Sequence, residues 1–130
     1  MLHGKNLKKK AIENEIILTG FIKGEQLNQI LSHASLFVMP SYHEGLPIAL
    51  LEAMSYNLKL LVSDISANQA LNLDKDLYFP VGDTSILKNK MQKTLVQNIE
   101  VNYIETISKE YDWTKLADKT YDLYKKVLTK

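Results

Sequence analysis

Apolar and polar residues follow one another along this chain in a pattern that predicts strands alternating with helices. Short apolar runs bounded by turn residues indicate strands, and apolar residues at a spacing of three or four positions indicate helices. The expected strands are residues 15–19, 35–39, 58–62 and 77–80. The expected helices are residues 7–13, a helix opened by 23–25, residues 47–56, residues 67–71, a helix capped by Asp83, residues 99–107, and a last helix capped by Asp112 or Thr114.

This order of elements predicts the fold class. Strands that alternate with helices favour a parallel sheet built from right-handed crossovers. The run at residues 35–39 carries no charge, as expected of a strand covered on both faces. We therefore expect an α/β, Rossmann-like parallel sheet with helices on both faces, followed by a C-terminal third that is all helix.

Composition excludes several classes of protein. The chain has 130 residues, 45% of them hydrophobic, and a formal net charge of +1. One domain, or part of one, fits this length, and the balanced charge gives no reason to expect nucleic acid as a partner. Cysteine is absent, which excludes disulfides and thiolate metal sites and fits a reducing compartment.

Two lysine clusters, at residues 8–10 and 125–130, leave membrane contact open. They could touch an anionic membrane surface, or they could simply be solvated helix ends. The second interpretation is favoured, because neither cluster lies beside a clear apolar face in the sequence.

Candidate chemistry concentrates in residues 41–54, which follow the apolar run 35–39. A strand, a polar turn containing Gly45 and a helix opened by Pro47 form a layout typical of ligand sites in α/β proteins. Proline at the first helical position would leave the amides of Ile48 and Ala49 free at the positive end of the helix. Gly45 would let a ligand approach the backbone closely. A phosphate group fits this arrangement.

Two glutamates flank the expected phosphate position. Glu52 would lean back toward the helix start, where its carboxylate could accept hydrogen bonds from both hydroxyls of a ribose. Glu44, before the helix, could accept from a second sugar or face positive charge developing at a reacting carbon. Alternatively, Glu44 is an exposed turn residue and Glu52 a solvated helix residue. The apolar neighbours of Glu52 predict partial burial, which would demand a partner.

Residues 41–54 resemble the two-glutamate signature of retaining nucleotide-sugar glycosyltransferases of the GT-B fold, the glycosyl transferases of group 1. The flanking segments resemble the same family in the same order. They are residues 18–22, 34–41, 61–65, 78–83 and 111–114. The resemblance implies roles for particular residues. Glu44 would be the catalytic residue that contacts the donor sugar, and Glu52 would bind the ribose. The donor-binding set so implied is Glu44, Gly45, Leu46, Ile48, Ala49 and Glu52, with Ile22 contacting the base.

The resemblance also implies which part of such an enzyme this is. Residues 1–130 correspond to a single, partial C-terminal donor-binding domain. The family's N-terminal acceptor domain and the first two strand–helix units are absent, with the Arg/Lys pair that they supply for the diphosphate. Without those strands, the strand expected at 15–19 would lose its neighbours. Ser66 and Ala70 also depart from the residues common in the family.

The implied function is transfer of a sugar from a UDP- or GDP-sugar to a glycan or lipid-linked acceptor in cell-surface polysaccharide synthesis. No metal and no other cofactor are expected. The chain would bind the donor and be inactive alone, in the cytoplasm or at the inner membrane face. The alternatives are a non-catalytic nucleotide-sugar module that pairs with a separate N-terminal half, and a nucleotide-sugar hydrolase or epimerase on a related fold. Exposed sheet edges leave a homodimer open.

Overall fold

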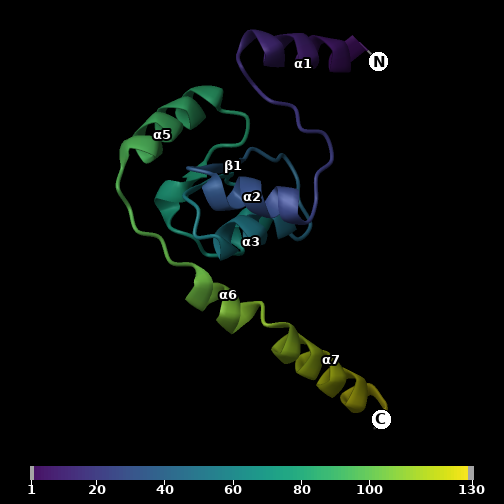
Figure 1. The fold of residues 1–130 in the computed structure, drawn as a ribbon. Coiled ribbons are helices and arrows are strands. Elements are labelled where there is room, and N and C mark those ends of the chain that lie inside the picture. Colours follow the sequence, from purple (N-terminus) through teal and green to yellow (C-terminus); the bar gives the residue numbers. More distant parts are fainter. Residues whose placement is uncertain (1, 129–130) are drawn as a thin grey trace. The chain divides into compact units, whose positions relative to one another are not determined.

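A computed structural model describes residues 2–128 of the chain, which form two compact units that divide between Ser32 and His33. The first unit holds α1 (Leu2–Glu13) and most of α2 (Glu25–His33). The second holds a three-stranded sheet and the remaining helices (Figure 1). Both helices confirm the sequence-based expectation. α1 corresponds to the helix expected at residues 7–13 but starts earlier, and α2 is the helix expected after residues 23–25.

The strand expected at residues 15–19 does not form. Glu15 has a φ of 56° and closes α1 in a left-handed turn, where the amide of Ile16 donates to the Ala11 carbonyl at 2.8 Å. Ile16, Ile17 and Leu18 follow as an irregular, exposed segment. A strand needs the backbone of a neighbour, and none of the described strands pairs with this segment. The apolar run was correctly located, but its secondary structure was predicted wrongly.

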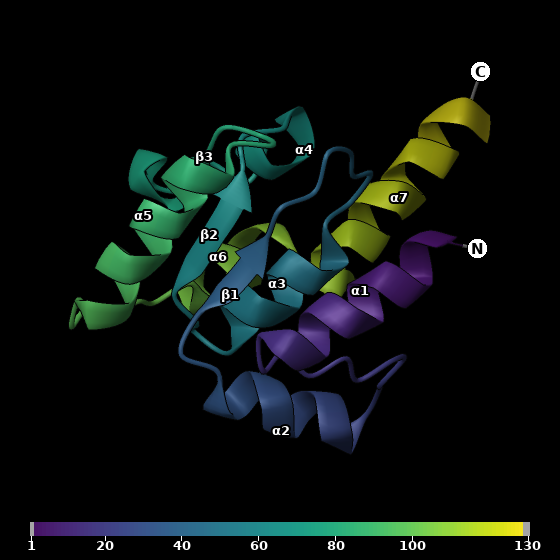
Figure 2. The same cartoon turned by 90° about the horizontal axis from the view of Figure 1, so that it is seen from above.

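The sheet consists of β1 (Phe37–Met39), β2 (Leu60–Ser63) and β3 (Tyr78–Phe79), in the order β1-β2-β3. Both pairings are parallel, and Figure 2 shows β1 and β2 side by side. Val38 lies opposite Leu61, and Val62 lies opposite Tyr78. The α/β class, the parallel sheet and three of the four expected strands are confirmed. Each strand is shorter than, or shifted from, its expected range.

The core lies around β2, the strand that is paired on both sides. All four of its residues are fully buried, as is usual for a central strand of a parallel sheet. Phe79 of β3 and Leu50, Ala53 and Met54 of α3 (Ile48–Ser55) complete this core. The helix ends at Ser55, with Tyr56 as its C-cap, and Asn57 follows with a φ of 52°, which confirms the expected stop near Asn57.

The segments that follow β2 and β3 return the chain across the sheet. They are α4 (Ser66–Gln69), the 3₁₀ helix η1 (Lys75–Leu77) and α5 (Thr84–Val96), which packs against β2 and β3. Asp83 caps α5 as expected, because its Oδ1 accepts from the Ile86 amide at 2.8 Å. At the other end of α5, the ammonium group of Lys59 donates to the carbonyls of Thr94 and Gln97.

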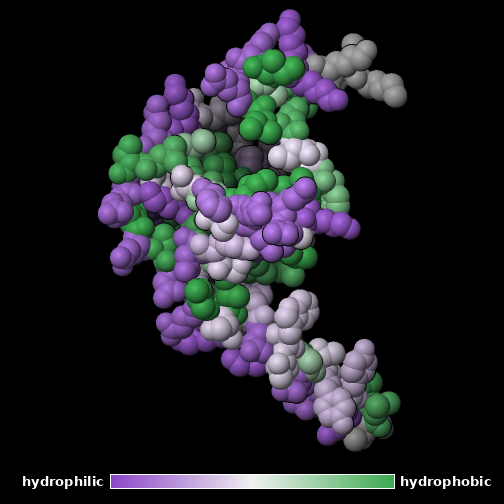
Figure 3. Space-filling model, in the orientation of Figure 1, coloured by the Kyte–Doolittle hydropathy of each residue, from purple (hydrophilic) through white to green (hydrophobic). Residues whose placement is uncertain are grey.

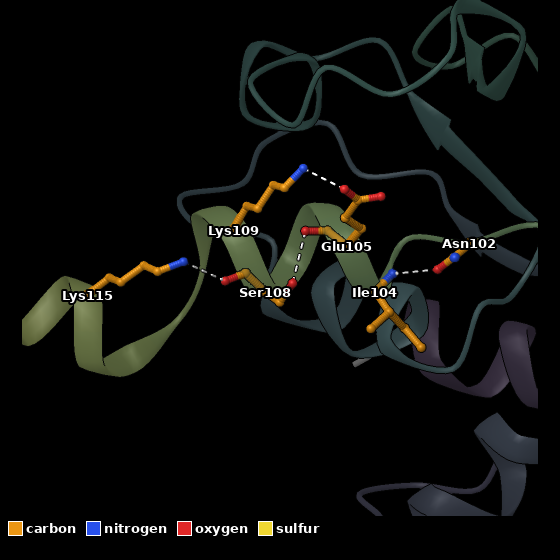
Figure 4. Close-up of polar contacts among 6 residues, drawn as sticks. All are labelled: Asn102, Ile104, Glu105, Ser108, Lys109 and Lys115. Atoms are coloured by element: carbon orange, nitrogen blue, oxygen red, sulfur yellow. Dashed lines mark hydrogen bonds and ion pairs between the residues drawn. The ribbon is translucent and has the colours of Figure 1, made fainter.

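Two helices follow α5, namely α6 (Ile104–Glu110) and α7 (Trp113–Leu128). The helix expected at 99–107 is therefore wrong in its first half, since the backbone turns extended at Gln97 and regains helical structure only at residue 104. Figure 4 shows the polar contacts of α6, in which Lys109 pairs with Glu105 at 2.5 Å and Lys115 donates to the Ser108 carbonyl at 3.3 Å. α6 packs against α3.

α7 begins where one of the two expected caps predicted. The Asp112 carboxylate accepts from the amides of Thr114 at 2.8 Å and Lys115 at 3.2 Å, and these bonds lower the pKa of Asp112. Apolar side chains of α7 are exposed, among them Leu123 and Val127, and Figure 3 shows hydrophobic beside hydrophilic atoms along this helix. Lys125 and Lys126 lie on the same helix as these exposed apolar side chains. Among the described helices, none is long and apolar enough to cross a bilayer.

Candidate functional site

The carboxyl ends of the three strands bring three loops to one edge of the sheet. Parallel strands end on the same side, which is where ligands bind in open α/β sheets. Hydrogen bonds join the loops at this edge. Ser63 Oγ donates to the Ser41 carbonyl at 2.6 Å, and the Val81 amide donates to Asp64 Oδ1 at 2.9 Å. The turn after β1 is therefore attached to β2, and the loop after β2 to the loop after β3.

Glu44 lies in the turn after β1 and is half-buried. Its Oε1 accepts a hydrogen bond of 2.6 Å from Ser41 Oγ, three residues earlier. Within residues 2–128, no basic side chain forms an ion pair with Glu44. One carboxylate oxygen thus accepts a hydrogen bond from Ser41, while the other can accept one from a ligand hydroxyl.

The start of α3 differs in detail from the expected anion site. Pro47 precedes the first helical residue rather than occupying that position, and its side chain is buried. The Ile48 amide is not free, because it donates to the Leu46 carbonyl at 2.8 Å. The Ala49 amide lies in the first helical turn, where an α-helix offers no internal acceptor. Of the two amides expected to be free, Ala49 is the one available to an anion without rearrangement.

The remaining candidates on this segment are open to solvent. Gly45, Leu46 and Ala49 are exposed, and no atom lies within 4 Å of where a Gly45 Cβ would stand. Glu52 is also exposed, so the expected partial burial is wrong. Its apolar neighbours Leu50, Ala53 and Met54 lie on the buried face of α3, whereas Glu52 lies on the outer face.

Ile22 belongs to the first compact unit and is half-buried. The other six candidates share one continuous segment of the second unit. The structure therefore brings those six together through local sequence, and the contact of Ile22 with a base stays a prediction.

Sequence reasoning did not single out the buried polar residues beneath this edge. Ser63 and Asn68 are fully buried, and Asn68 Nδ2 donates to the Ser63 carbonyl at 2.8 Å and to Ser63 Oγ at 3.3 Å. Tyr78 Oη donates to the Asn68 carbonyl at 3.2 Å, and burial raises the pKa of Tyr78. A polar residue ending the apolar run 60–62 was the available signal for Ser63. Nothing in the sequence pointed to Asn68.

Tyr42 and Gly82 face each other across the same edge. Gly82 has a φ of 81°, and a Cβ added to it would lie 3.3 Å from Tyr42 Oη. The loop after β3 therefore leaves room for the Tyr42 side chain of the site turn.

A separate cavity of about 510 Å³ is lined by residues that include Lys59, Asp74 and Tyr103, and by none of the predicted site residues. Burial, and then the charge of Asp74, raise the pKa of Tyr103 to about 12. Among residues 2–128, no group of three His, Cys, Asp or Glu side chains is placed to hold a metal ion.

Comparison with known proteins shows the family to which this chain belongs. Residues 2–97 match the family described as glycosyl transferases group 1, and the chain belongs to that family. A galactosyltransferase of Escherichia coli, named for transfer from UDP-Gal to GlcNAc-diphosphoundecaprenol, is 32% identical over 125 residues, or 92% of this chain. The E. coli serotype-specific mannosyltransferase WbdA is 27% identical over 119 residues, or 88% of the chain.

A third relative is the alpha-galactosylglucosyldiacylglycerol synthase of Streptococcus pneumoniae, 24% identical over 128 residues, or 95% of the chain. This chain spans 15% of the mannosyltransferase, 30% of the galactosyltransferase and 33% of the synthase. Two of these relatives are named as glycosyltransferases and the third as a galactosylglucosyldiacylglycerol synthase, and the family match confirms the expected resemblance to the glycosyl transferases of group 1.

Proposed function

We propose that this chain supplies the donor-binding site of a retaining glycosyltransferase that transfers a sugar from a UDP- or GDP-sugar to a glycan or lipid-linked acceptor. The observation that carries the proposal is the position of residues 41–54. In a member of the glycosyl transferases group 1 family, this segment stands at the carboxyl edge of a parallel sheet with Glu44 and Glu52 on either side of a helix start.

The geometry supports separate roles for the two glutamates. Side chains on a helix lean toward its N-terminus, so the exposed Glu52 carboxylate reaches back along α3, where it accepts from a ribose diol. The diphosphate lies at the Ala49 amide, where the helix dipole favours negative charge, and gains the Ile48 amide if that group releases Leu46. Glu44 then faces the transferred sugar and supports the positive charge that develops at its reacting carbon.

We propose that the leaving diphosphate is stabilised by these amides and by the Arg/Lys pair from the rest of such an enzyme, and that no metal or other cofactor is needed. The chain spans at most a third of these three relatives. We therefore propose that this segment binds the donor, and that transfer requires the acceptor-binding remainder of such an enzyme.

Isothermal titration calorimetry with UDP, UDP-galactose, GDP and GDP-mannose tests the assignment. Glu52→Ala should weaken binding of the free nucleotide and of the intact donor alike, by about tenfold for each ribose hydroxyl that loses its charged acceptor. Glu44→Ala should weaken binding of the intact donor and leave binding of the free nucleotide unchanged. Glu105→Ala, an exposed glutamate on α6, is the matched control and should change neither. Absence of binding at millimolar ligand, or equal effects of both changes on free nucleotide, would contradict the proposal.

A second candidate function is a non-catalytic module that pairs with a separate N-terminal half. The exposed Ile16–Leu18 segment favours it, since an apolar run without strand partners is a ready surface for association. Co-expression with the part of the E. coli galactosyltransferase that this chain does not cover is the direct test. Recovery of a complex that Ile17→Lys abolishes would support pairing. Self-association lost in the same variant would instead indicate a homodimer.

The expected location, the cytoplasm with weak contact at the inner membrane face, also stands as a proposal. Its support is α7, which combines exposed Leu123 and Val127 with Lys125 and Lys126. Sedimentation with phosphatidylglycerol vesicles should carry the chain down at low salt and release it at high salt. Equal recovery in the supernatant with and without vesicles would remove this part of the proposal.

A further inference from the structure

The Glu44 carboxylate is oriented by one contact that the predicted site residues do not include. Ser41 Oγ and Glu44 Oε1 are 2.6 Å apart, within the range of charge-assisted O–H···O⁻ hydrogen bonds. A serine has one hydroxyl proton, and here it is committed to Glu44. Since no ion pair fixes Glu44 among the described residues, this bond is what selects one orientation of the carboxylate.

Ser41 is itself held from the sheet. Its carbonyl accepts from Ser63 Oγ at 2.6 Å, and Ser63 is a fully buried residue of the strand paired on both sides. Ser63 Oγ in turn accepts from Asn68 Nδ2 at 3.3 Å. The donors run from Asn68 to Ser63 and from Ser63 to the Ser41 carbonyl, and these two bonds reinforce each other through the Ser63 hydroxyl that they share. The Ser41 hydroxyl, a separate group of the same residue, donates to Glu44.

The Asn68 side chain is oriented by these bonds. Exchanging its amide oxygen and nitrogen would place two oxygens, Asn68 Oδ1 and the Ser63 carbonyl, against each other. In the present orientation Asn68 Oδ1 has no hydrogen-bond partner within residues 2–128. Leaving a buried oxygen unpaired costs free energy. This cost comes with the orientation in which the Asn68 amide donates to Ser63.

We propose that Ser41 is a positioning residue for Glu44, and that Ser63 and Asn68 fix the backbone from which Ser41 acts. This inference rests on the proposed function, in which Glu44 faces the sugar of the donor. Ser41 holds Oε1 and leaves the second oxygen directed toward the sugar hydroxyls. Its contribution therefore falls on recognition of the sugar and not on recognition of the nucleotide.

Ser41→Ala and Ser41→Thr form the test pair, because threonine keeps the hydroxyl that alanine removes. Calorimetry with UDP, UDP-galactose, GDP and GDP-mannose should show that Ser41→Ala lowers the affinity for the sugar nucleotide about tenfold. The affinity for the free nucleotide should change less than about twofold. Ser41→Thr should restore the loss. An equal loss for free nucleotide and sugar nucleotide, or no loss at all, would overturn the positioning role.

A readout without ligand separates this inference from the proposed function. The ¹³C resonance of the Glu44 carboxyl carbon should shift in Ser41→Ala and return in Ser41→Thr. If wild-type chain binds none of the four ligands, the proposed function fails. If the Glu44 resonance is unchanged in Ser41→Ala, the positioning role fails whatever the binding result. Thermal melting of each variant confirms that the fold is retained.

Discussion

Replacing either of two glycines at the carboxyl edge of the sheet by alanine should have opposite effects on stability. Gly82 has a φ of 81°, where a residue with a Cβ is strained by about 1–2 kcal/mol. The new Cβ would also lie 3.3 Å from Tyr42 Oη. Tyr42 is 77% exposed and can move aside, so this contact adds little to the strain. Gly82→Ala should therefore lower the free energy of unfolding by about 1–2 kcal/mol and the melting temperature by about 3–8 °C.

Gly45 is the matched control, because it lies in the same set of loops but has no such constraint. Its φ lies outside the left-handed region, and nothing lies within 4 Å of an added Cβ. Gly45→Ala should raise the free energy of unfolding by about 0.4–1 kcal/mol, because alanine restricts the unfolded chain. The same change should weaken binding of UDP-galactose or GDP-mannose, since the methyl group occupies space proposed for the donor.

Urea unfolding followed by circular dichroism, with a thermal melt of each variant, measures both effects. A Gly82→Ala/Tyr42→Ala double variant isolates the contact with Tyr42, and its stability should equal the sum of the two single changes. A neutral Gly82→Ala, or a Gly45→Ala that is destabilised by more than about 1 kcal/mol, would refute this account of the loops.

Two further predictions concern the other end of the sheet. Lys59→Met should lower the free energy of unfolding by about 1–2 kcal/mol, because it leaves the carbonyls of Thr94 and Gln97 without their donor. Urea unfolding measures this loss, and it should show none for the control Lys88→Met, which replaces an exposed lysine. Tyr103 should titrate near pH 12 in an absorbance titration at 295 nm, and its signal should vanish in Tyr103→Phe. Because its pKa is raised in the folded chain, the folded state keeps this proton while the unfolded state loses it, so stability should fall as the pH rises from about 10 to 12, and less steeply in Tyr103→Phe. Identical slopes for the two proteins would contradict the burial of this hydroxyl.

The sequence predicted the elements whose formation depends on local pattern. The strands at β1, β2 and β3, the cap at Asp83 and the stop at Asn57 all follow from apolar runs and capping residues in the chain itself. The segment 15–19 has an equally strong pattern, yet it forms no strand, because pairing depends on a neighbour that local sequence does not encode. The irregular stretch before α6 was missed for a similar reason. Lys59, far from it in sequence, donates to the end of α5.

The candidate site was predicted in its residues more fully than in its geometry. The segment 41–54 stands where the strand–turn–helix pattern indicated, with Glu44 and Glu52 on either side of the helix start. The exposure of Glu52 could not be read from its apolar neighbours, because they occupy the opposite face of α3. The bonds from Ser41 to Glu44 and from Ser63 to Ser41 depend on how loops meet in space. Spacing alone does not reveal them.

The contacts at the two ends of β2 determine which loops can be exchanged between members of the family. Ser63 at one end holds the turn after β1, and Lys59, the residue just before its other end, holds the end of α5. What the strand requires of the turn is one backbone carbonyl at position 41, which any amino acid supplies. A turn transplanted from the mannosyltransferase or the galactosyltransferase should therefore be accepted by this scaffold without altering the sheet. Donor preference could then be changed by swapping a loop, while β2 and its two terminal contacts stay as they are.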